Sequence, residues 1–360
     1  MQLHKVGYSL LVLLFLGAVG CNKSTSSDLA AITAGGNSPT PTPTPAPQTN
    51  FKLYVGVQGN DGHSYVQTLT YDSAAHTYAV AVNSKFQVDD GAAISADSLR
   101  VTTDMLDGNI LLGGGSNTLR VFNTSNNTVS NSITLTGLSD VAGACWLPNG
   151  HLLASQYGTG FTQTLKEFDA TGAYVRDVVT AANFVVDCKA VSNTTVYLMD
   201  YNGNSDSWTE VKKAVFSGSS WSVTDSFDAT TLGAGNSRYA LVVHSNGKLY
   251  LPPQNPETGL VTRQMMSCSQ SNLSGTCASV GDDISADTVI PSSGDCSTPQ
   301  GAVEIPGTNE LLVMSNLCAT GGALLMRYDL TTGVYTPLTS SSGVLPSNFS
   351  GNGVRFMRIR

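Results

Sequence analysis

The segment Phe168-Asp169-Ala170-Thr171-Gly172 decides the fold, because it ends an apolar β run in a tight turn. An aspartate side chain can cap such a turn, and a glycine supplies the positive φ that the turn needs. An aromatic residue followed by Asp or Asn recurs along the chain at intervals of 46 to 62 residues. The strong members are Tyr71-Asp72, Phe122-Asn123, Phe168-Asp169 and Tyr328-Asp329, and the weaker ones are Phe216-Ser217 and the region Met266 to Cys268. This regularity indicates a structural repeat.

A second turn precedes each marker and joins two further strands. Such turns are Leu106-Asp107-Gly108-Asn109, Pro148-Asn149-Gly150, Ser245-Asn246-Gly247 and Gly307-Thr308-Asn309. Each unit therefore has four antiparallel strands, and no apolar pattern of helical period accompanies them. Repeated four-stranded units predict an all-β fold, a β-propeller, in which repetition around an axis leaves only short, protected edges. The markers predict six blades, with seven as the alternative.

The two ends of the predicted domain complement each other. Gly353-Val354-Arg355-Phe356-Met357-Arg358 has the pattern of an inner strand without a unit of its own. Phe51-Lys52-Leu53-Tyr54-Val55 begins a unit that lacks an inner strand. Pairing of the C-terminal strand with the N-terminal blade would complete one blade and close the propeller.

On these repeats, residues 51 to 360 resemble the six-bladed propellers of the NHL, YncE-like and gluconolactonase-like superfamily. The resemblance leaves the activity open, because these relatives include lactonases, dehydrogenases, lyases and pure binding proteins. A gluconolactonase-like enzyme would hold a divalent ion in the channel, for which inner strands offer Asp187 and Glu304. Arg100 and Arg238 stand where further ligands would be needed, which argues against lactonase activity.

Residues 1 to 20 have the organisation of a secretory signal, with a basic start, an apolar run from about Leu10 and small residues before Cys21. Leu16-Gly17-Ala18-Val19-Gly20-Cys21 resembles the bacterial lipobox, which implies cleavage before Cys21 and lipidation of its sulfur. The apolar run is shorter than the about 20 residues that a membrane span needs. The same resemblance implies sorting to the outer membrane, because residue 22 is Asn and not Asp. The membrane face stays open.

Residues 21 to 50 form a linker between the lipid anchor and the domain. They are rich in Pro, Thr and Ser, and the alternation from Pro39 to Pro47 favours an extended polyproline II spacer. The 29 residues from 22 to 50 would reach roughly 90 Å at about 3.1 Å each. We therefore expect a propeller domain, residues 51 to 360, tethered at a distance from its membrane.

The charge balance argues against a nucleic-acid partner. The chain has 18 Lys and Arg against 26 Asp and Glu, and loss of Lys5 with the signal leaves 17 minus 26, or −9. Nucleic-acid binding proteins need clustered basic residues to neutralise phosphates. The oligomeric state is left open by the sequence.

The chain has seven cysteines, an odd number. If Cys21 is lipidated, six cysteines remain, and these can form three disulfides in an oxidising compartment. Cys268 and Cys277 flank a hairpin-sized loop. The blade alignment pairs Cys145 with Cys188, at similar inner-strand positions, and Cys296 with Cys318, on one face of blade 6. Six cysteines allow fifteen pairings, so these two pairs depend on the alignment.

Three arginines, Arg100, Arg238 and Arg355, fall near the starts of inner strands. Converging guanidinium groups at a channel mouth would bind a carboxylate, a phosphate or an acidic sugar through bidentate pairs. The alternative, which we prefer, is that they pair with acidic residues as struts between blades. The acidic partners considered are Asp97, Asp140, Asp187 and Glu304.

A calcium loop is a second candidate site, since Asp200, Asn202, Asn204 and Asp206 place oxygen ligands at alternate positions. The segment lacks the glycine and glutamate spacing of the EF-hand pattern, so an ordinary Asx-rich turn is the preferred interpretation. No other cofactor is indicated. The chain also lacks the Gly-x-Ser-x-Gly elbow and the His-Glu-x-x-His pair of common hydrolases.

The sequence therefore favours a noncatalytic binding or scaffold module, carried on a lipoprotein, that recognises a polypeptide or a glycan across its loop face. Large Gly-, Asn- and Tyr-rich loops on a rigid scaffold suit recognition. The alternative is an enzyme of lactonase, lyase or dehydrogenase type with its site at the mouth of the central channel.

Overall fold

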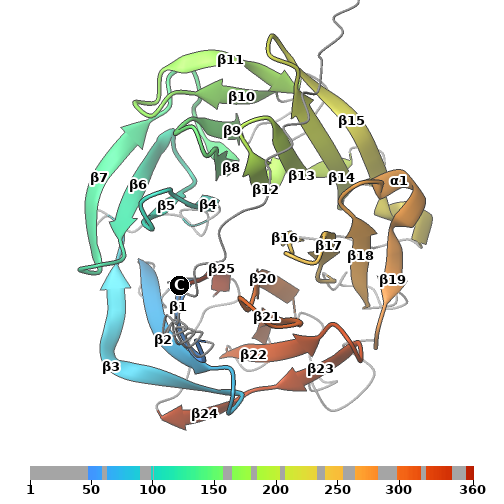
Figure 1. Ribbon diagram of the computed structural model, residues 1–360. Helices are drawn as coiled ribbons and strands as arrows, with labels where there is room; N and C mark the ends of the chain where they lie inside the picture. Colours follow the sequence, from blue (N-terminus) through green and yellow to red (C-terminus); the bar gives the residue numbers. More distant parts are fainter. Residues whose placement is uncertain are drawn as a thin grey trace, which may run out of the picture. The chain divides into compact units, whose positions relative to one another are not determined.

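The computed structural model describes residues 48–58, 63–89, 99, 101–156, 164–179, 185–202, 207–232, 240–253, 264–282, 298–317, 322–342 and 354–360. They belong to one unit, Pro47–Arg360. Within this unit the strands form six sheets arranged in a ring (Figure 1). Cys296, Cys318 and their predicted pairing lie outside the described residues.

The blades follow the chain in order, each from its innermost to its outermost strand. Blade 1 contains β25 (Val354–Ile359), β1 (Asn50–Gln58), β2 (Ser64–Asp72) and β3 (Thr77–Gln87). Blade 2 contains β4 (Val101–Asp104), β5 (Ile110–Gly113), β6 (Thr118–Asn123) and β7 (Thr128–Thr134). Blade 3 contains β8 (Val141–Trp146), β9 (Leu152–Gln156), β10 (Leu165–Phe168) and β11 (Tyr174–Val179).

The second half of the ring repeats this order. Blade 4 contains β12 (Val185–Ser192), β13 (Thr195–Asn202), β14 (Ser207–Phe216) and β15 (Trp221–Asp228). Blade 5 contains β16 (Val242–Val243), β17 (Lys248–Leu251), β18 (Met265–Ser269) and β19 (Ala278–Val280). Blade 6 contains β20 (Thr298–Glu304), β21 (Glu310–Leu317), β22 (Gly322–Asp329) and β23 (Val334–Pro337). The predicted six four-stranded blades are confirmed.

The ring closes as the sequence predicted. Strand β25 pairs antiparallel with β1, with Leu53 opposite Ile359 and Val57 opposite Val354. Lys52 and Arg360 continue the ladder with two backbone hydrogen bonds of 2.8 Å. Blade 1 also gains a strand that the sequence did not indicate, because β24 (Thr339–Ser342) pairs in parallel with the outer edge of β3. The chain thus fastens blade 1 at both of its edges.

Two faces of the ring differ in their connections. The turns between first and second strands and between third and fourth strands share one face, which we call the turn face. The connections between second and third strands and from blade to blade share the opposite one, the loop face. Strand β1 begins on the turn face, because Asn50 pairs with Asp72 at the end of β2 and Lys52 pairs with Arg360 at the end of β25.

The aromatic–Asp/Asn markers of the repeat have two structural roles, one for the aromatic ring and one for the polar side chain. Their aromatic rings fill the space between blades, with Tyr71, Phe122 and Phe168 fully buried and Tyr328 2% exposed. Their polar residues cap the following turn. Asp169 Oδ1 accepts hydrogen bonds from the amides of Thr171 (2.8 Å) and Ala173 (3.1 Å).

The other markers cap their turns in the same way. Asp72, Asn123 and Asp329 each accept hydrogen bonds from amide groups two and three residues further on. Each turn then needs a left-handed residue, which is Gly333 in blade 6 but His76 in blade 1 and Asn127 in blade 2. The repeat is therefore encoded locally, one turn at a time.

Two disulfides join the predicted partners. Cys145 on β8 and Cys188 on β12 link the inner strands of blades 3 and 4, with their Cα atoms 5.2 Å apart. Cys268 and Cys277 enclose the turn after β18, with their Cα atoms 4.1 Å apart. This second turn contains a short helix, α1 (Leu273–Thr276), that the sequence did not indicate.

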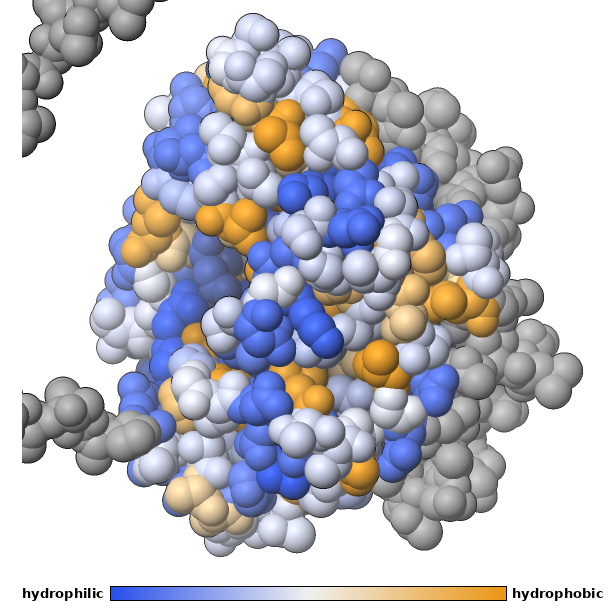
Figure 2. All heavy atoms as spheres, turned by 45° about the vertical axis from the view of Figure 1, so that its right-hand side comes forward, coloured by the Kyte–Doolittle hydropathy of each residue, from blue (hydrophilic) through white to orange (hydrophobic). Residues whose placement is uncertain are grey.

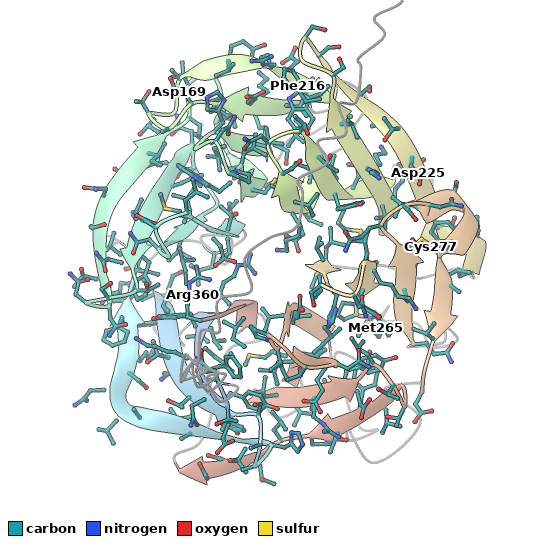
Figure 3. All side chains as sticks on the ribbon, in the orientation of Figure 1. Asp169, Phe216, Asp225, Met265, Cys277 and Arg360 are labelled. Atoms are coloured by element: carbon teal, nitrogen blue, oxygen red, sulfur yellow. A yellow bond between two sulfur atoms is a disulfide. The ribbon has the colours of Figure 1, made fainter. Side chains whose placement is uncertain are left out.

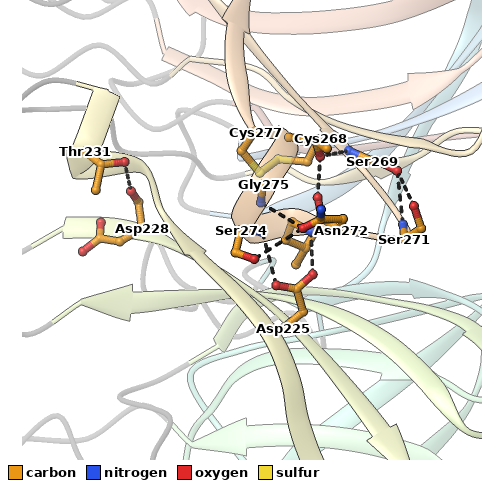
Figure 4. The surroundings of a disulfide bond; sticks show 12 residues. Asp225, Asp228, Thr231, Cys268, Ser269, Ser271, Asn272, Ser274, Gly275 and Cys277 are labelled. Atoms are coloured by element: carbon orange, nitrogen blue, oxygen red, sulfur yellow. Dashed lines mark hydrogen bonds between the residues drawn. A yellow bond between two sulfur atoms is a disulfide. The ribbon is translucent and has the colours of Figure 1, made fainter.

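The Cys268–Cys277 turn is fastened to the neighbouring blade (Figure 4). The side chain of Asn272 caps α1 by accepting the amide of Gly275 at 2.9 Å. The carboxylate of Asp225, on β15 of blade 4, accepts the amides of Leu273 (2.5 Å) and Ser274 (3.2 Å). One carboxylate therefore holds blades 4 and 5 together at their outer ends.

The remaining helical element is η1, a 3-10 helix over Ala229–Leu232. Neither it nor α1 has the length and hydrophobicity that crossing a bilayer requires, and the rest of the described chain contains no such helix.

We predict that Asp225→Ala destabilises the domain by about 1–3 kcal/mol, because the amides of α1 lose a charged acceptor. Burial raises the pKa of Asp225, but the amides of Leu273 and Ser274 outweigh it and hold the pKa below its ordinary value near 3.8. A lowered pKa contributes stability above that ordinary value, and the contribution disappears as the pH falls through the lowered pKa. Denaturant unfolding of both proteins at pH 7 and pH 3 should show a difference that is smaller at pH 3.

Asp107→Ala is the matched control, because Asp107 caps only its own exposed turn, through the amide of Asn109. An equal loss in both variants would show that Asp225 does not join the two blades.

Candidate functional site

The inner strands enclose a cavity of about 570 Å³ at the turn-face end of the channel. We call it the turn-face cavity. Strands from five of the six blades contribute to its wall, which combines charged and aliphatic side chains. The wall contains Asp104, Lys189–Val191, Leu241–Val243, Ser245, Ala302–Glu304, Pro306, Gly307, Arg358 and Ile359.

Asp104 holds two arginines at one side of this cavity. Its Oδ1 lies 2.6 Å from Nη2 of Arg360, and its Oδ2 lies 3.5 Å from Nε of Arg358. Arg358 also donates through Nη2 to the carbonyl of Thr102 on β4. Figure 3 shows Arg360 on the inner side of the ring, whereas Asp169 and Asp225 lie on its outer rim. The arginines thus tie the closing strand β25 to blade 2.

Lys189 lies on β12 and faces the same cavity, with 24% of its side chain exposed. Its Nζ is 2.9 Å from Oδ1 of Asp187, whose Oδ2 accepts the amide of Leu241 in blade 5 at 2.9 Å. Burial lowers the pKa of Lys189, and the nearby Arg358 charge lowers it further, against the opposite effects of Asp187 and Asp104. The cavity wall thus places two cationic groups close to each other.

Glu304 forms the opposite side of the cavity with the turn after β16. Its carboxylate accepts the amide of Ser245 at 3.1 Å and the hydroxyl of Ser245 at 2.5 Å. His244 is buried, and its Nδ1 accepts the amide of Asn246 at 3.0 Å, so a neutral ring carries its proton on Nε2. That nitrogen lies 3.8 Å from Oε1 of Glu304 and has no hydrogen-bond partner among the described residues. Burial lowers the pKa of His244 more than Glu304 raises it.

The two acids that could have held a lactonase-type metal ion therefore bind other groups. Asp187 accepts a lysine and a backbone amide, and Glu304 accepts both donors of Ser245. The part of the chain that the structure describes contains no group of three or more His, Cys, Asp or Glu side chains placed to hold a metal ion. These residues do not fit a divalent metal centre.

The predicted arginine site lies mostly outside the described residues. Arg100 and Arg238 belong to undescribed segments, and the side chain of Arg355 on β25 is not described either. The cations seen at the channel are Lys189, Arg358 and Arg360, at the opposite ends of inner strands. The sequence prediction did not include these three residues, because it considered basic residues at the starts of inner strands and not those just before the turns.

The predicted calcium loop is described only at its first residues. Asp200 lies within β13, is fully buried and binds Nζ of Lys212 at 2.6 Å. The side chain of Asn202, together with Asn204 and Asp206, lies outside the described residues. The calcium site stays a prediction, with one of its ligands already engaged in a buried ion pair.

A smaller cavity of about 150 Å³ opens between blades 1 and 2 on the loop face. Its wall includes Asp89, Arg120 and the backbone of Gly113–Ser116. The Asp89 carboxylate is buried and accepts the amide of Ser64 at 2.6 Å and Nε2 of Gln87 at 2.6 Å. His63, at the end of the β1–β2 connection on the loop face, lies 3.2 Å from the same carboxylate.

The surface of the ring carries mixed chemistry. On the side shown in Figure 2, hydrophobic residues are scattered among hydrophilic ones. Scattered apolar residues are ordinary on a soluble surface and do not mark a docking site.

Two solved structures show a similar backbone path. The structure of U3-55K has 11% sequence identity and a TM-score of 0.49, over 85% of this chain and 86% of that chain. Hydrazine synthase of Kuenenia stuttgartiensis has 11% identity and a TM-score of 0.49, over 83% of this chain and 92% of that chain. No protein-family model and no curated protein matches the sequence. The strand pairing within this chain is what establishes its fold.

We predict that Arg358→Gln raises the pKa of Lys189, because removing a neighbouring positive charge favours the protonated ammonium. The pH dependence of amine labelling at Lys189, followed by peptide mass spectrometry, measures this shift. Arg327→Gln is the control, because Arg327 pairs with Glu310 on blade 6 through a contact of 2.6 Å. An unchanged or lower Lys189 pKa in Arg358→Gln would contradict the assignment.

Proposed function

We propose that this protein is a lipoprotein of the bacterial outer membrane whose propeller is a noncatalytic binding module for a polypeptide or a glycan, bound on the loop face. We also propose kinship with the NHL, YncE-like and gluconolactonase-like propellers, on the repeat pattern of the sequence. Three features of the molecule support the proposal: the chain's attachment point, the pairing of its acidic groups, and its disulfides.

The main support for the proposal is the position at which the linker joins the domain. The linker joins the domain at Gln48–Asn50, and Asn50 begins β1 on the turn face. The connections between second and third strands lie on the opposite face, together with the blade-to-blade connections. A tether on one face leaves the other face clear for a partner, and loops on a rigid scaffold are the usual place for recognition.

The pairing of acidic groups supports a scaffold over an enzyme. Asp187, Glu304 and Asp225 each accept donors of a neighbouring blade. Glu167 on β10 does the same, since it accepts Nε1 of Trp221 on β15 at 3.0 Å. Carboxylates that are used in this way are not available as general acids or metal ligands.

The disulfides support export. Two are present among the described residues, and disulfides persist in oxidising compartments such as the bacterial periplasm or the cell surface. They agree with a signal over residues 1–20 and with lipidation of Cys21. Acyl chains on that sulfur would anchor the protein, with about 0.8 kcal/mol for each buried methylene.

An enzyme with its site at the channel mouth is the second candidate. The observation that favours it is Nε2 of His244, which lies beside Glu304 and has no hydrogen-bond partner among the described residues; the neighbouring Val243 and Ser245 line a cavity large enough for a substrate. A lactonase, lyase or dehydrogenase would then act from the turn face.

We predict that Cys21→Ser moves the protein from the membrane fraction to the soluble fraction, because the lipidated sulfur is lost. Immunoblotting of the two fractions measures the change, and the mass of the N-terminal peptide of the unaltered protein tests the lipid directly. Cys277→Ser is the control, because Cys277 pairs with Cys268 inside the domain. Membrane association that persists in Cys21→Ser would contradict the anchor.

We predict that a photocrosslinking amino acid at position 116 captures the partner in intact cells, whereas the same amino acid at position 106 does not. Ser116 is exposed on the loop face of blade 2, and Leu106 is 64% exposed on the turn face of the same blade. Mass spectrometry of the adducts distinguishes peptide from glycan. Adducts from position 106 alone would overturn the assignment to the loop face.

A further inference from the structure

We propose that the turn-face cavity is a binding site for a small organic monocarboxylate with an apolar body. The site is distinct from the loop-face site proposed above and lies at the opposite end of the channel. Neither proposal depends on the other.

The dimensions and walls of the cavity suit such a ligand. Its volume of about 570 Å³ lies within the range of about 300–1,000 Å³ that is usual for small-molecule sites. Aliphatic side chains such as Val191, Val243 and Ile359 line it beside the charged groups. A ligand therefore needs an apolar part to displace water from these walls.

The anionic group of the ligand would bind beside Lys189. An ammonium group has three donors, and the described residues give the Lys189 group one acceptor, Oδ1 of Asp187 at 2.9 Å. The group faces the cavity, and the guanidinium of Arg358, on β25 of blade 1 across the ring, contributes a second positive charge to the lining. A carboxylate beside Lys189 would fill a vacant donor and relieve the repulsion between the two cations.

Glu304 determines that the other end of the ligand carries no negative charge. Its carboxylate lies on β20 of blade 6, two blades from the β12 strand that carries Lys189, and is held there by Ser245. A second anionic group on the ligand would face this carboxylate and be repelled. The ligand therefore carries one negative charge and not two.

Binding is linked to pH through Lys189. The charged groups around it are Asp187 on its own strand, Asp104 on β4 and Arg358 on β25, with Glu304 on β20 across the cavity. A bound carboxylate favours the ammonium form and takes up a proton wherever Lys189 is partly neutral. The affinity for a carboxylate should then fall as the pH rises through the pKa of Lys189.

The test is calorimetric titration of the mature chain carrying Cys21→Ser, whose unit Pro47–Arg360 is closed on itself. The probes are butyrate, pentanoate and hexanoate, with adipate and inorganic phosphate for comparison. We expect affinity to rise about fourfold for each added methylene, and hexanoate to bind at least tenfold more tightly than adipate or phosphate. Lys189→Met should weaken hexanoate binding at least tenfold.

Two further variants keep the test decisive. Lys213→Met is the matched control, because Nζ of Lys213 donates to the carbonyl of Gln270, away from the cavity, and we expect unchanged affinity. Val191→Glu adds a negative charge at a cavity residue that is 42% exposed, so the fold should tolerate it while binding weakens. Absence of hexanoate binding, phosphate binding as tightly as hexanoate, or equal affinity in Lys189→Met and the unaltered protein would each overturn the proposal.

Discussion

The pairing of β25 with β1 is the constraint on which the rest of the structure depends. It joins the last strand of the chain to the first, so that blade 1 gains its inner strand and the ring has no open end. The hydrophobic clusters then bridge adjacent blades, as in the cluster that contains Leu53, Leu312 and Leu325 from blades 1 and 6. The same strand brings Arg358 and Arg360 to Asp104 of blade 2. Closure therefore fixes both the hydrophobic core and one wall of the channel.

Several acidic residues of this ring connect neighbouring blades. Asp225, Asp187 and Glu304 each accept backbone amides of a neighbouring blade. Several donors offset the cost of desolvating a partly buried carboxylate. Among the described residues, Lys189 has one acceptor, Asp187, and faces the turn-face cavity.

The two faces differ for reasons of chain connectivity. Turns within a blade are short, are capped by Asp or Asn and hold the inner strands in register around the turn-face cavity. The loop face receives the longer connections and lies opposite the point where the linker enters at Asn50. A single domain thus has a cavity at the turn-face end of its channel and the longer connections on its opposite face.

The six units, their turns and the closing strand could be predicted from the sequence, because they follow from strand alternation and from turn chemistry within a few residues of Asp169 or Gly333. The two disulfides that are described could be predicted from the alignment of these units. It did not reveal the α1 turn, the β24 edge strand or the contacts of Lys189, Arg358 and Asp104. Those depend on how the sheets pack around the axis, and they join residues that lie tens to hundreds of positions apart. Tertiary structure alone decides them, because the position of each inner strand relative to its neighbours is set by core packing between blades and not by any local pattern.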